Sequence, residues 1–383
     1  MGLIVYTLVL FPLLLAVRAM LLRRDLATDD MTPHITVMIA AYNEERTITA
    51  RIENLFESDY PRDRIQIVVA SDGSTDRTHE IVESFADESV KLSVQPRQGK
   101  GRTLSAAVVH ADHEILVFTD ANTVFLRQSL RALIRLFADP TVGGVAGNQI
   151  YECDGSASLT ADGERVYWSF DRVLKGWQSA AGNVTSATGA IYAIRRSLFE
   201  PVPDDAMDDF MISTGVVAQG KRLVFAKDAV AIEPVAVRGR VEFSRKVRVI
   251  TQGLRSVLHR RGLLNPLAHG FYALQLVSHK VLRRLLVLPL LVIACLAPLL
   301  SSDGAFFHVV AIAEFAFFTS AIAGMVMRPW LKGPLKVLAI PFYVCMVNAA
   351  ALVALVNTLI GRRIERWEPE RHLAETRCVS EGR

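Results

Sequence analysis

The sequence predicts an α/β domain with a mainly parallel sheet, placed between apolar segments long enough to cross a membrane. The first observation is that short apolar runs alternate with helical stretches over residues 33–235, an order typical of parallel strands with helices on both faces. The second is composition: 51% of the 383 residues are hydrophobic and the mean hydropathy is +0.28. The third is that acidic residues follow the strand candidates. These observations predict a ligand site at one sheet edge, near a membrane.

The strand candidates are apolar runs rich in β-branched residues. They cover residues 35–39, 65–69, 91–94 and 115–118, with helix candidates between them at 44–58, 76–85 and 103–110. Tyr42 and Glu44 follow the first strand, while Asp72 follows the second and Asp120 the fourth. Ligands of parallel sheets bind beyond the carboxyl ends of the strands. We therefore expect these side chains to lie near a common ligand.

The N-terminal apolar segment, residues 3–22, has about the 20 residues that a spanning helix needs. Its positive charges, Arg18, Arg23 and Arg24, follow the apolar core instead of preceding it. This order argues against the alternative, a cleaved signal peptide. The positive-inside rule then places the N-terminus outside and the following domain in the cytoplasm.

Three more spans are expected near the C-terminus, at residues 285–300, 305–327 and 337–360. Three spans after a cytoplasmic domain would leave the tail outside, whereas the basic residues Arg362 and Arg363 argue for the inside. Either one segment is re-entrant or the tail departs from the rule.

Residues 241–262 combine apolar residues at helical spacing, such as Val247 and Leu254, with basic neighbours. This pattern predicts an amphipathic helix in the membrane interface, or alternatively an ordinary surface helix. The expected divisions are an N-terminal membrane helix (1–24), the α/β domain (33–240), amphipathic interface helices (241–282), about three membrane helices (283–361) and a polar tail (362–383).

Several function classes are unsupported. The four cysteines have no CxxC spacing, so a structural zinc site is not expected. The basic residues cluster beside apolar spans, which suits anionic lipids and not nucleic acid. Gly99 and Gly101 flank Lys100 without forming a GxGxxG or Walker motif. Before a helix start they suit a diphosphate contact or a plain turn.

Six short motifs occur in a fixed order along the chain. They are AAYNEE at 40–45, SDGSTD at 71–76, GKG at 99–101, FTDANT at 118–123, GAIYAIR at 189–195 and DDF at 208–210. In this order, with flanking apolar spans, the chain resembles the family 2 glycosyltransferases over nearly its whole length. The similar branch is the membrane-bound one, which includes synthases of cellulose, hyaluronan and poly-N-acetylglucosamine. The resemblance implies a GT-A fold, a nucleotide-sugar donor, usually a UDP-sugar, and inversion at the anomeric carbon.

The resemblance also implies donor-binding roles. Tyr42, Glu44 and Asp72 would hold the nucleoside, and Lys100 would lie near the diphosphate. Asp120 would face a Mg²⁺ or Mn²⁺ ion that bridges the two phosphates. A hard dication with oxygen ligands would neutralise the charge that develops on a diphosphate leaving group.

By the same resemblance, Asp209 matches the general base, which takes the proton from the acceptor hydroxyl as it attacks. Asp208 and Gly189 would lie on the acceptor side. Asp204 and Asp205 are close enough in sequence that a different register stays open, as does a plain acidic surface loop.

The chain departs from the family pattern in two places. Asn122 stands at the second acidic position of the DxD motif; its carboxamide oxygen can bind the metal but adds no negative charge. The processive synthases carry QxxRW, and the matching residues 245–249 keep only the arginine, Arg248. Arg248 is expected to contact the donor phosphates, while loss of the tryptophan argues against processive polymerisation.

The sequence therefore predicts an inverting glycosyltransferase of a bacterial-type inner membrane, with its catalytic domain in the cytoplasm. It would transfer a sugar from a nucleotide-sugar, a UDP-sugar by resemblance, to a membrane-associated glycan or lipid acceptor. The expected partners are donor, acceptor, membrane lipids and an export subunit, with no nucleic acid. Polysaccharide synthesis and the addition of one sugar to a lipid-linked acceptor both remain open. The alternative from another class is a non-catalytic export subunit with a degenerate glycosyltransferase fold.

Overall fold

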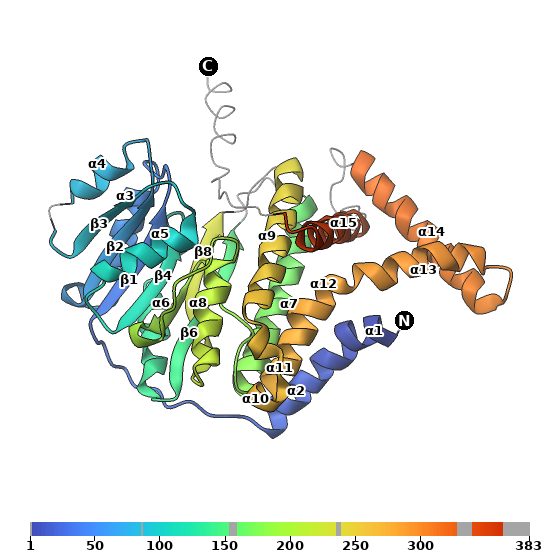
Figure 1. Ribbon diagram of the computed structural model, residues 1–383, viewed down its shortest axis with the longest axis horizontal. Coiled ribbons are helices and arrows are strands. Elements are labelled where there is room, and N and C mark those ends of the chain that lie inside the picture. The colour runs from blue at the N-terminus through green and yellow to red at the C-terminus, as the bar shows by residue number, and fades with distance from the viewer. Residues whose placement is uncertain (1, 86, 153–158, 235–238, 328–338, 363–383) are drawn as a thin grey trace, which may run out of the picture.

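The computed structural model describes residues 2–85, 87–152, 159–234, 239–327 and 339–362. Within them, one eight-stranded sheet has the order β3-β2-β1-β4-β7-β6-β8-β5 (Figure 1). The strands are β1 Ile35–Ala41, β2 Ile65–Asp72, β3 Val90–Gln95, β4 Ile115–Asp120, β5 Val124–Phe125, β6 Val142–Glu152, β7 Tyr192–Arg195 and β8 Arg222–Pro234. All four predicted strands are confirmed. The predicted tail from residue 363 on lies outside the described residues.

The sheet is parallel at one end and mixed at the other. β1 pairs in parallel with β2 and β4, and β2 pairs in parallel with β3. β7 is antiparallel to β4 and β6, while β6 and β8 are parallel and the short β5 is antiparallel to β8. In the parallel part, Ala41 lies beside Ser71 and Ala40 beside Asp120. The carboxyl ends of β1, β2 and β4 therefore meet at one edge.

Helices cover both faces of the sheet because successive side chains of a strand point to opposite faces. Val37 and Ile39 of β1 pack in one core with Ile52 of α3, whereas Met38 packs in a second core with Leu104 of α5. The helices of this domain are α3 Ile48–Phe56, α4 Thr78–Glu83, α5 Lys100–Ala107, α6 Ser129–Ile134, α7 Leu159–Ala181 and α8 Asp208–Ala218. Both sheet faces are thus buried, as predicted.

The helices that flank this domain are mostly apolar. They are α1 Gly2–Val5, α2 Phe11–Leu21, α9 Gly239–His259, α10 Pro266–His269, α11 Phe271–Leu276, α12 Arg283–Leu285, α13 Val287–Leu299, α14 Ala305–Val326 and α15 Ala339–Leu359. Among the described residues, the helices over Gly2–Leu21, Ala305–Val326 and Ile340–Leu359 are long and apolar enough to cross a membrane.

The segment predicted as a span at 285–300 is different. Its helix α13 has only 13 residues, and it qualifies only together with Phe271–Leu285, from which it is bent by 41°. Pro289 lacks the N–H that would bond to Leu285, which accounts for a break at this point. This geometry fits either a broken span or a re-entrant pair, so both alternatives given above for the tail stay open. The division into domains remains a prediction.

The amphipathic segment predicted at 241–262 corresponds to α9. Val247, Leu254 and Val257 are buried on this helix, while Leu258 is 59% exposed. α9 packs against the apolar helix α15, and Figure 1 shows it between the sheet and α15. Its other side carries residues that line the cavity described next.

Candidate active site

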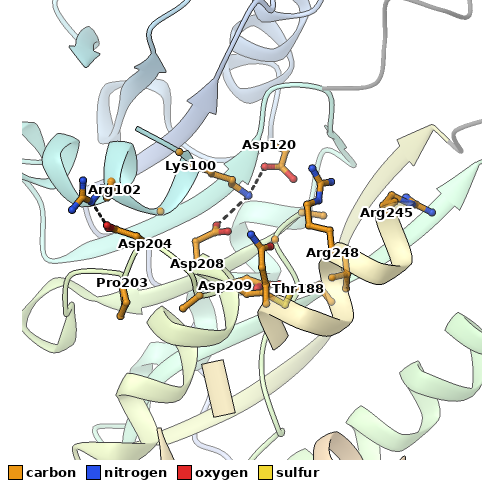
Figure 2. Close-up of a pocket in the computed structure, with 18 of the residues that line it drawn as sticks. Lys100, Arg102, Asp120, Thr188, Pro203, Asp204, Asp208, Asp209, Arg245 and Arg248 are labelled. Carbon is orange, nitrogen blue, oxygen red and sulfur yellow. Dashed lines mark ion pairs between the residues drawn. The ribbon is translucent and has the colours of Figure 1, made fainter. Parts of the chain in front are cut away.

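A cavity of about 320 Å³ lies at the carboxyl end of β4, with α9 forming one of its walls (Figure 2). Its lining comes from distant parts of the chain, namely residues 98–102, 188–190, 203, 204, 206–209, 245, 246, 248, 249 and 252, together with Asp120, Gln149 and Glu233. The structure thus brings together six of the predicted site residues. These six are Lys100, Asp120, Gly189, Asp208, Asp209 and Arg248.

Lys100 stands at the centre of this cavity. Its Nζ lies 2.7 Å from Oδ1 of Asp120 and 3.1 Å from Oδ2 of Asp208 (Figure 2, dashed lines). Burial alone would lower the pKa of Lys100, but the carboxylates of Asp120 and Asp208 more than offset this, so its pKa is raised. A Cβ on Gly189 would lie only 3.3 Å from the Lys100 ammonium. The absence of a side chain at Gly189 leaves room for this close approach.

Asp209 sits in the first turn of α8, where the helix dipole favours a negative charge. Its Oδ1 accepts a 2.7 Å hydrogen bond from the backbone N–H of Phe210. Burial and the neighbouring Asp208 carboxylate nevertheless raise the pKa of Asp209 to about 6. A carboxylate with this pKa is ionised at neutral pH and is a stronger base than an ordinary aspartate.

The two acids that left the register open have other contacts. Asp204 forms an ion pair with Arg102 at the cavity wall. Asp205 binds Arg255 at 2.5 Å and His259 at 2.8 Å, and so ties the loop before α8 to α9. Burial alone would raise the pKa of Asp205, but the hydrogen bonds with His259 and Arg255 outweigh it and lower this pKa, which does not suit a general base.

Basic side chains from α9 form another wall. Arg245, Lys246 and Arg248 all line the cavity, and Figure 2 shows Arg245 and Arg248 on this helix. Ser256 of α9 accepts a 2.8 Å hydrogen bond from the N–H of Met207, just before Asp208. The helix is therefore fastened to the loop that presents the acidic pair.

Asp72 lies outside the cavity lining, at the end of β2. Its Oδ1 accepts hydrogen bonds from the backbone N–H groups of Gln98 and Gly99, at 2.7 and 2.9 Å, and from Thr103 Oγ1 at 2.9 Å. Arg97 donates to the other oxygen at 2.6 Å. The buried carboxylate thus fixes the loop that leads to Lys100.

The other residues predicted to hold the nucleoside lie beside this loop, also outside the cavity lining. The Arg97 guanidinium stacks on the ring of Tyr42, 3.3 Å from its centroid. Glu44 is buried and accepts a 2.7 Å hydrogen bond from Thr47 Oγ1. The structure therefore shows Glu44 in contact with its own helix start.

The residues that could hold a dication are oxygen donors near Lys100. Among the described residues, no three His, Cys, Asp or Glu side chains form a ready metal cluster. However, Oδ1 of Asp120 and Oδ2 of Asp208 are buried and both pair with the Lys100 ammonium, so two carboxylate oxygens converge on one point of the cavity. Carboxylate oxygens of this kind are the ligands that Mg²⁺ and Mn²⁺ prefer. The donor set therefore fits a hard dication at Asp120, whereas Asn122 is not among the lining residues.

Among the cavity residues that the sequence analysis did not single out are Gln149 of β6 and Glu233 of β8. Gln149 Nε2 donates a hydrogen bond to Oε2 of Glu233. Burial and the charge of Asp120 raise the pKa of Glu233 to about 7. Glu233 stands near the carboxyl end of its strand, the position that drew attention to Asp72 and Asp120.

Comparisons with known proteins agree with this geometry. A family model described as glycosyl transferase family 2 matches residues 36–202. An N-acetylglucosaminyltransferase of Azorhizobium caulinodans is 28% identical over 177 residues, which cover 45% of this chain and 44% of that protein. A poly-β-1,6-N-acetyl-D-glucosamine synthase of Staphylococcus aureus is 24% identical over 209 residues, or 52% and 50% of the two chains. The chain thus spans about half the length of these curated relatives.

A solved structure extends the likeness to nearly the whole chain. A mannosyltransferase from Pyrobaculum calidifontis, in complex with GDP-mannose and Mn²⁺, superposes with a TM-score of 0.70 at 25% identity. The match covers 94% of this chain and 98% of the mannosyltransferase. The predicted GT-A fold is confirmed, and residues 36–202 match the family 2 glycosyltransferases, with apolar helices before and after this segment.

Proposed function

We propose that this chain transfers a sugar from a nucleotide-sugar donor to a membrane-associated glycan or lipid acceptor, with inversion at the anomeric carbon. The observation that carries the proposal is the presence of Asp209 in the same cavity as the Lys100–Asp120 pair. A base with a pKa of about 6 and a buried cation beside it are the two groups that inverting transfer requires.

The donor diphosphate is proposed to bind against Lys100 and Arg248. In the complex, the negatively charged diphosphate would take over part of the pairing with Lys100 that the Asp120 and Asp208 carboxylates now provide. Positively charged groups aimed at the diphosphate stabilise the charge that develops as the sugar–phosphate bond breaks. A dication at Asp120, when bound, would neutralise the same leaving group. The nucleoside would lie toward Tyr42 and Arg97.

On the acceptor side, Asp209 would accept the proton of the attacking hydroxyl. In this single displacement a bond forms between the acceptor oxygen and the anomeric carbon, and the bond from that carbon to the phosphate oxygen breaks. The proton passes to the Asp209 carboxylate, and the nucleoside diphosphate leaves. Because α9 lies between this cavity and α15, the acceptor is proposed to approach from the membrane side.

The positive-inside pattern around Arg23 and Arg24 supports a cytoplasmic catalytic domain in an inner membrane. Val249, which stands where processive synthases have the tryptophan of QxxRW, lines the cavity. An aliphatic side chain offers no ring for stacking against an acceptor sugar. This substitution supports transfer of one sugar over continuous polymerisation.

A donor panel tests the proposal. The full chain in lipid discs receives UDP-glucose, UDP-N-acetylglucosamine, UDP-galactose, UDP-glucuronate and GDP-mannose in turn, with Mg²⁺ or Mn²⁺ and a membrane lipid extract as the acceptor source. We expect release of free nucleotide from one donor and labelled product in the lipid phase. Absence of sugar transfer from every donor would contradict the enzymatic proposal, and a ladder of product sizes would contradict single transfer.

A further inference from the structure

Glu233 is a carboxylate of the cavity to which neither the family motifs nor the roles above give a task. Its Oε1 lies 3.4 Å from the hydroxyl of Thr123, and its Oε2 accepts a hydrogen bond from Gln149. Thr123 belongs to the turn that follows Asp120, where its own N–H contacts the Asp120 carbonyl at 3.4 Å. The Glu233 carboxylate is therefore held against the same turn that carries Asp120, and both side chains line one cavity.

The motif at this turn lacks its second carboxylate. Asn122 occupies that position, and its side chain is not among those that line the cavity. A dication in contact with a diphosphate gains affinity from each negatively charged oxygen ligand that the protein provides. Because Asn122 carries no charge, Asp120 would be the one carboxylate that this turn supplies to a dication.

Glu233 can bind a dication while it keeps its contacts with Gln149 and Thr123. A carboxylate has about four lone-pair sites on its two oxygens. The hydrogen bond from Gln149 and the contact with Thr123 leave lone pairs on both, and these contacts fix the orientation of the side chain. β8 brings this carboxylate in from the far end of the sheet, next to β6, so it reaches the cavity from a different side than Asp120.

We propose that Glu233 supplies the second carboxylate ligand of the dication that binds at Asp120, in place of the acidic residue that Asn122 replaces. This inference rests on the proposed function, because it assumes a metal-bound nucleoside diphosphate in the cavity. Gln149 and Thr123 then act as positioning residues that hold Glu233 toward the metal.

The test measures metal affinity directly, without turnover. The full chain in lipid discs is titrated with Mn²⁺ in the presence of saturating UDP or GDP, and free Mn²⁺ is followed by electron paramagnetic resonance. Glu233→Gln should weaken Mn²⁺ binding at least tenfold, about the change expected when a group that supports a metal site is removed. Asn122→Ala should change the affinity less than threefold.

Glu114→Gln is the matched control. Glu114 precedes the amino end of β4, whereas Asp120 lies at the carboxyl end of the same strand. The Glu114 side chain is 70% exposed and pairs with Arg195. Its substitution should therefore leave Mn²⁺ binding unchanged. Nucleotide binding without metal verifies that each variant is folded. Unchanged Mn²⁺ affinity in Glu233→Gln, with or without loss of turnover, would overturn the inference. Failure of the proposed function is a separate result, namely absence of sugar transfer by the unmodified chain in the donor panel.

Discussion

The two ends of the proposed donor site are built differently. Beside the nucleoside end, the Asp72 carboxylate is saturated by donors of its own chain, including the N–H groups of Gln98 and Gly99. At the reacting end, Asp120 and Asp208 share the single ammonium of Lys100 through one buried oxygen each. The Asp72 carboxylate therefore has its partners without a ligand, whereas two carboxylates with one shared cation leave negative charge available for a dication.

This difference predicts different consequences of substitution. Removing a carboxylate that the fold itself uses should lower stability, because buried donors lose their acceptor. Removing a charged group at the reacting end should mainly lower turnover. Proteins commonly keep imperfectly satisfied polar groups at functional sites and compensate elsewhere.

In this comparison of Lys100 with Asp72, the larger effect on turnover is expected for Lys100→Met. The substitution leaves the Asp120 and Asp208 carboxylates without their shared cation and removes a positive charge from the diphosphate site. Turnover should fall by about 10²- to 10³-fold, the cost of losing one electrostatic contact to a developing charge. Nucleotide release assayed at saturating donor measures this effect, and Lys91→Met, at an exposed ion pair with Asp112, is the control. Turnover within tenfold of the unmodified chain would remove Lys100 from the reacting end.

Asp72→Asn should act on the fold. The isosteric amide cannot accept all the hydrogen bonds that Arg97, Gln98, Gly99 and Thr103 now donate, and the free energy of unfolding should fall by about 1–3 kcal/mol. Thermal denaturation in detergent, followed by circular dichroism, measures the loss as a lower Tm. Unchanged Tm together with abolished donor binding would contradict this account, because Asp72 would then bind the donor and would not stabilise the loop.

The pH dependence gives a smaller and more specific effect. Because the pKa of Asp209 is raised to about 6, kcat/KM should fall as the pH drops through about 6 and the base becomes protonated. Glu233, with a pKa of about 7, can contribute to the same acidic limb. Asp208→Asn distinguishes the two, because the Asp208 charge raises the pKa of Asp209. In this variant the acidic limb of kcat/KM should move to lower pH. A limb at unchanged pH would mean that a group other than Asp209 causes it.

The sequence predicts the parallel half of the fold well. β1 and β2 are buried along their whole length, and their sequences are the nearly continuous apolar runs typical of strands covered on both faces. The acidic residues at their ends then follow from topology. The position of a residue at a strand end does not predict where its side chain points. Glu44 follows β1 at this edge of the sheet, but its carboxylate accepts a hydrogen bond from Thr47.

Residues brought by later elements are harder to predict. The strand candidates stop at residue 118, so the rule that identifies Asp72 and Asp120 does not reach Glu233 at the end of β8. The pairing of β8 with β6 is parallel and joins residues far apart in the sequence, so a pattern within a short sequence window does not predict it. Arg248 is found through the family resemblance alone, since a basic residue on an amphipathic helix is equally suited to lipid headgroups. Its place in the cavity depends on how α9 packs.

The central claim is that Asp209 performs proton transfer in a site that other groups build. Asp209→Asn in lipid discs, compared with Glu114→Gln, tests it through two readings on one sample: sugar transfer from the active donor, and the Kd of the nucleoside diphosphate. The account predicts that transfer falls by about 10²- to 10⁴-fold, the range for a general base, while the Kd changes less than threefold. Transfer that persists at the level of the unmodified chain would contradict it.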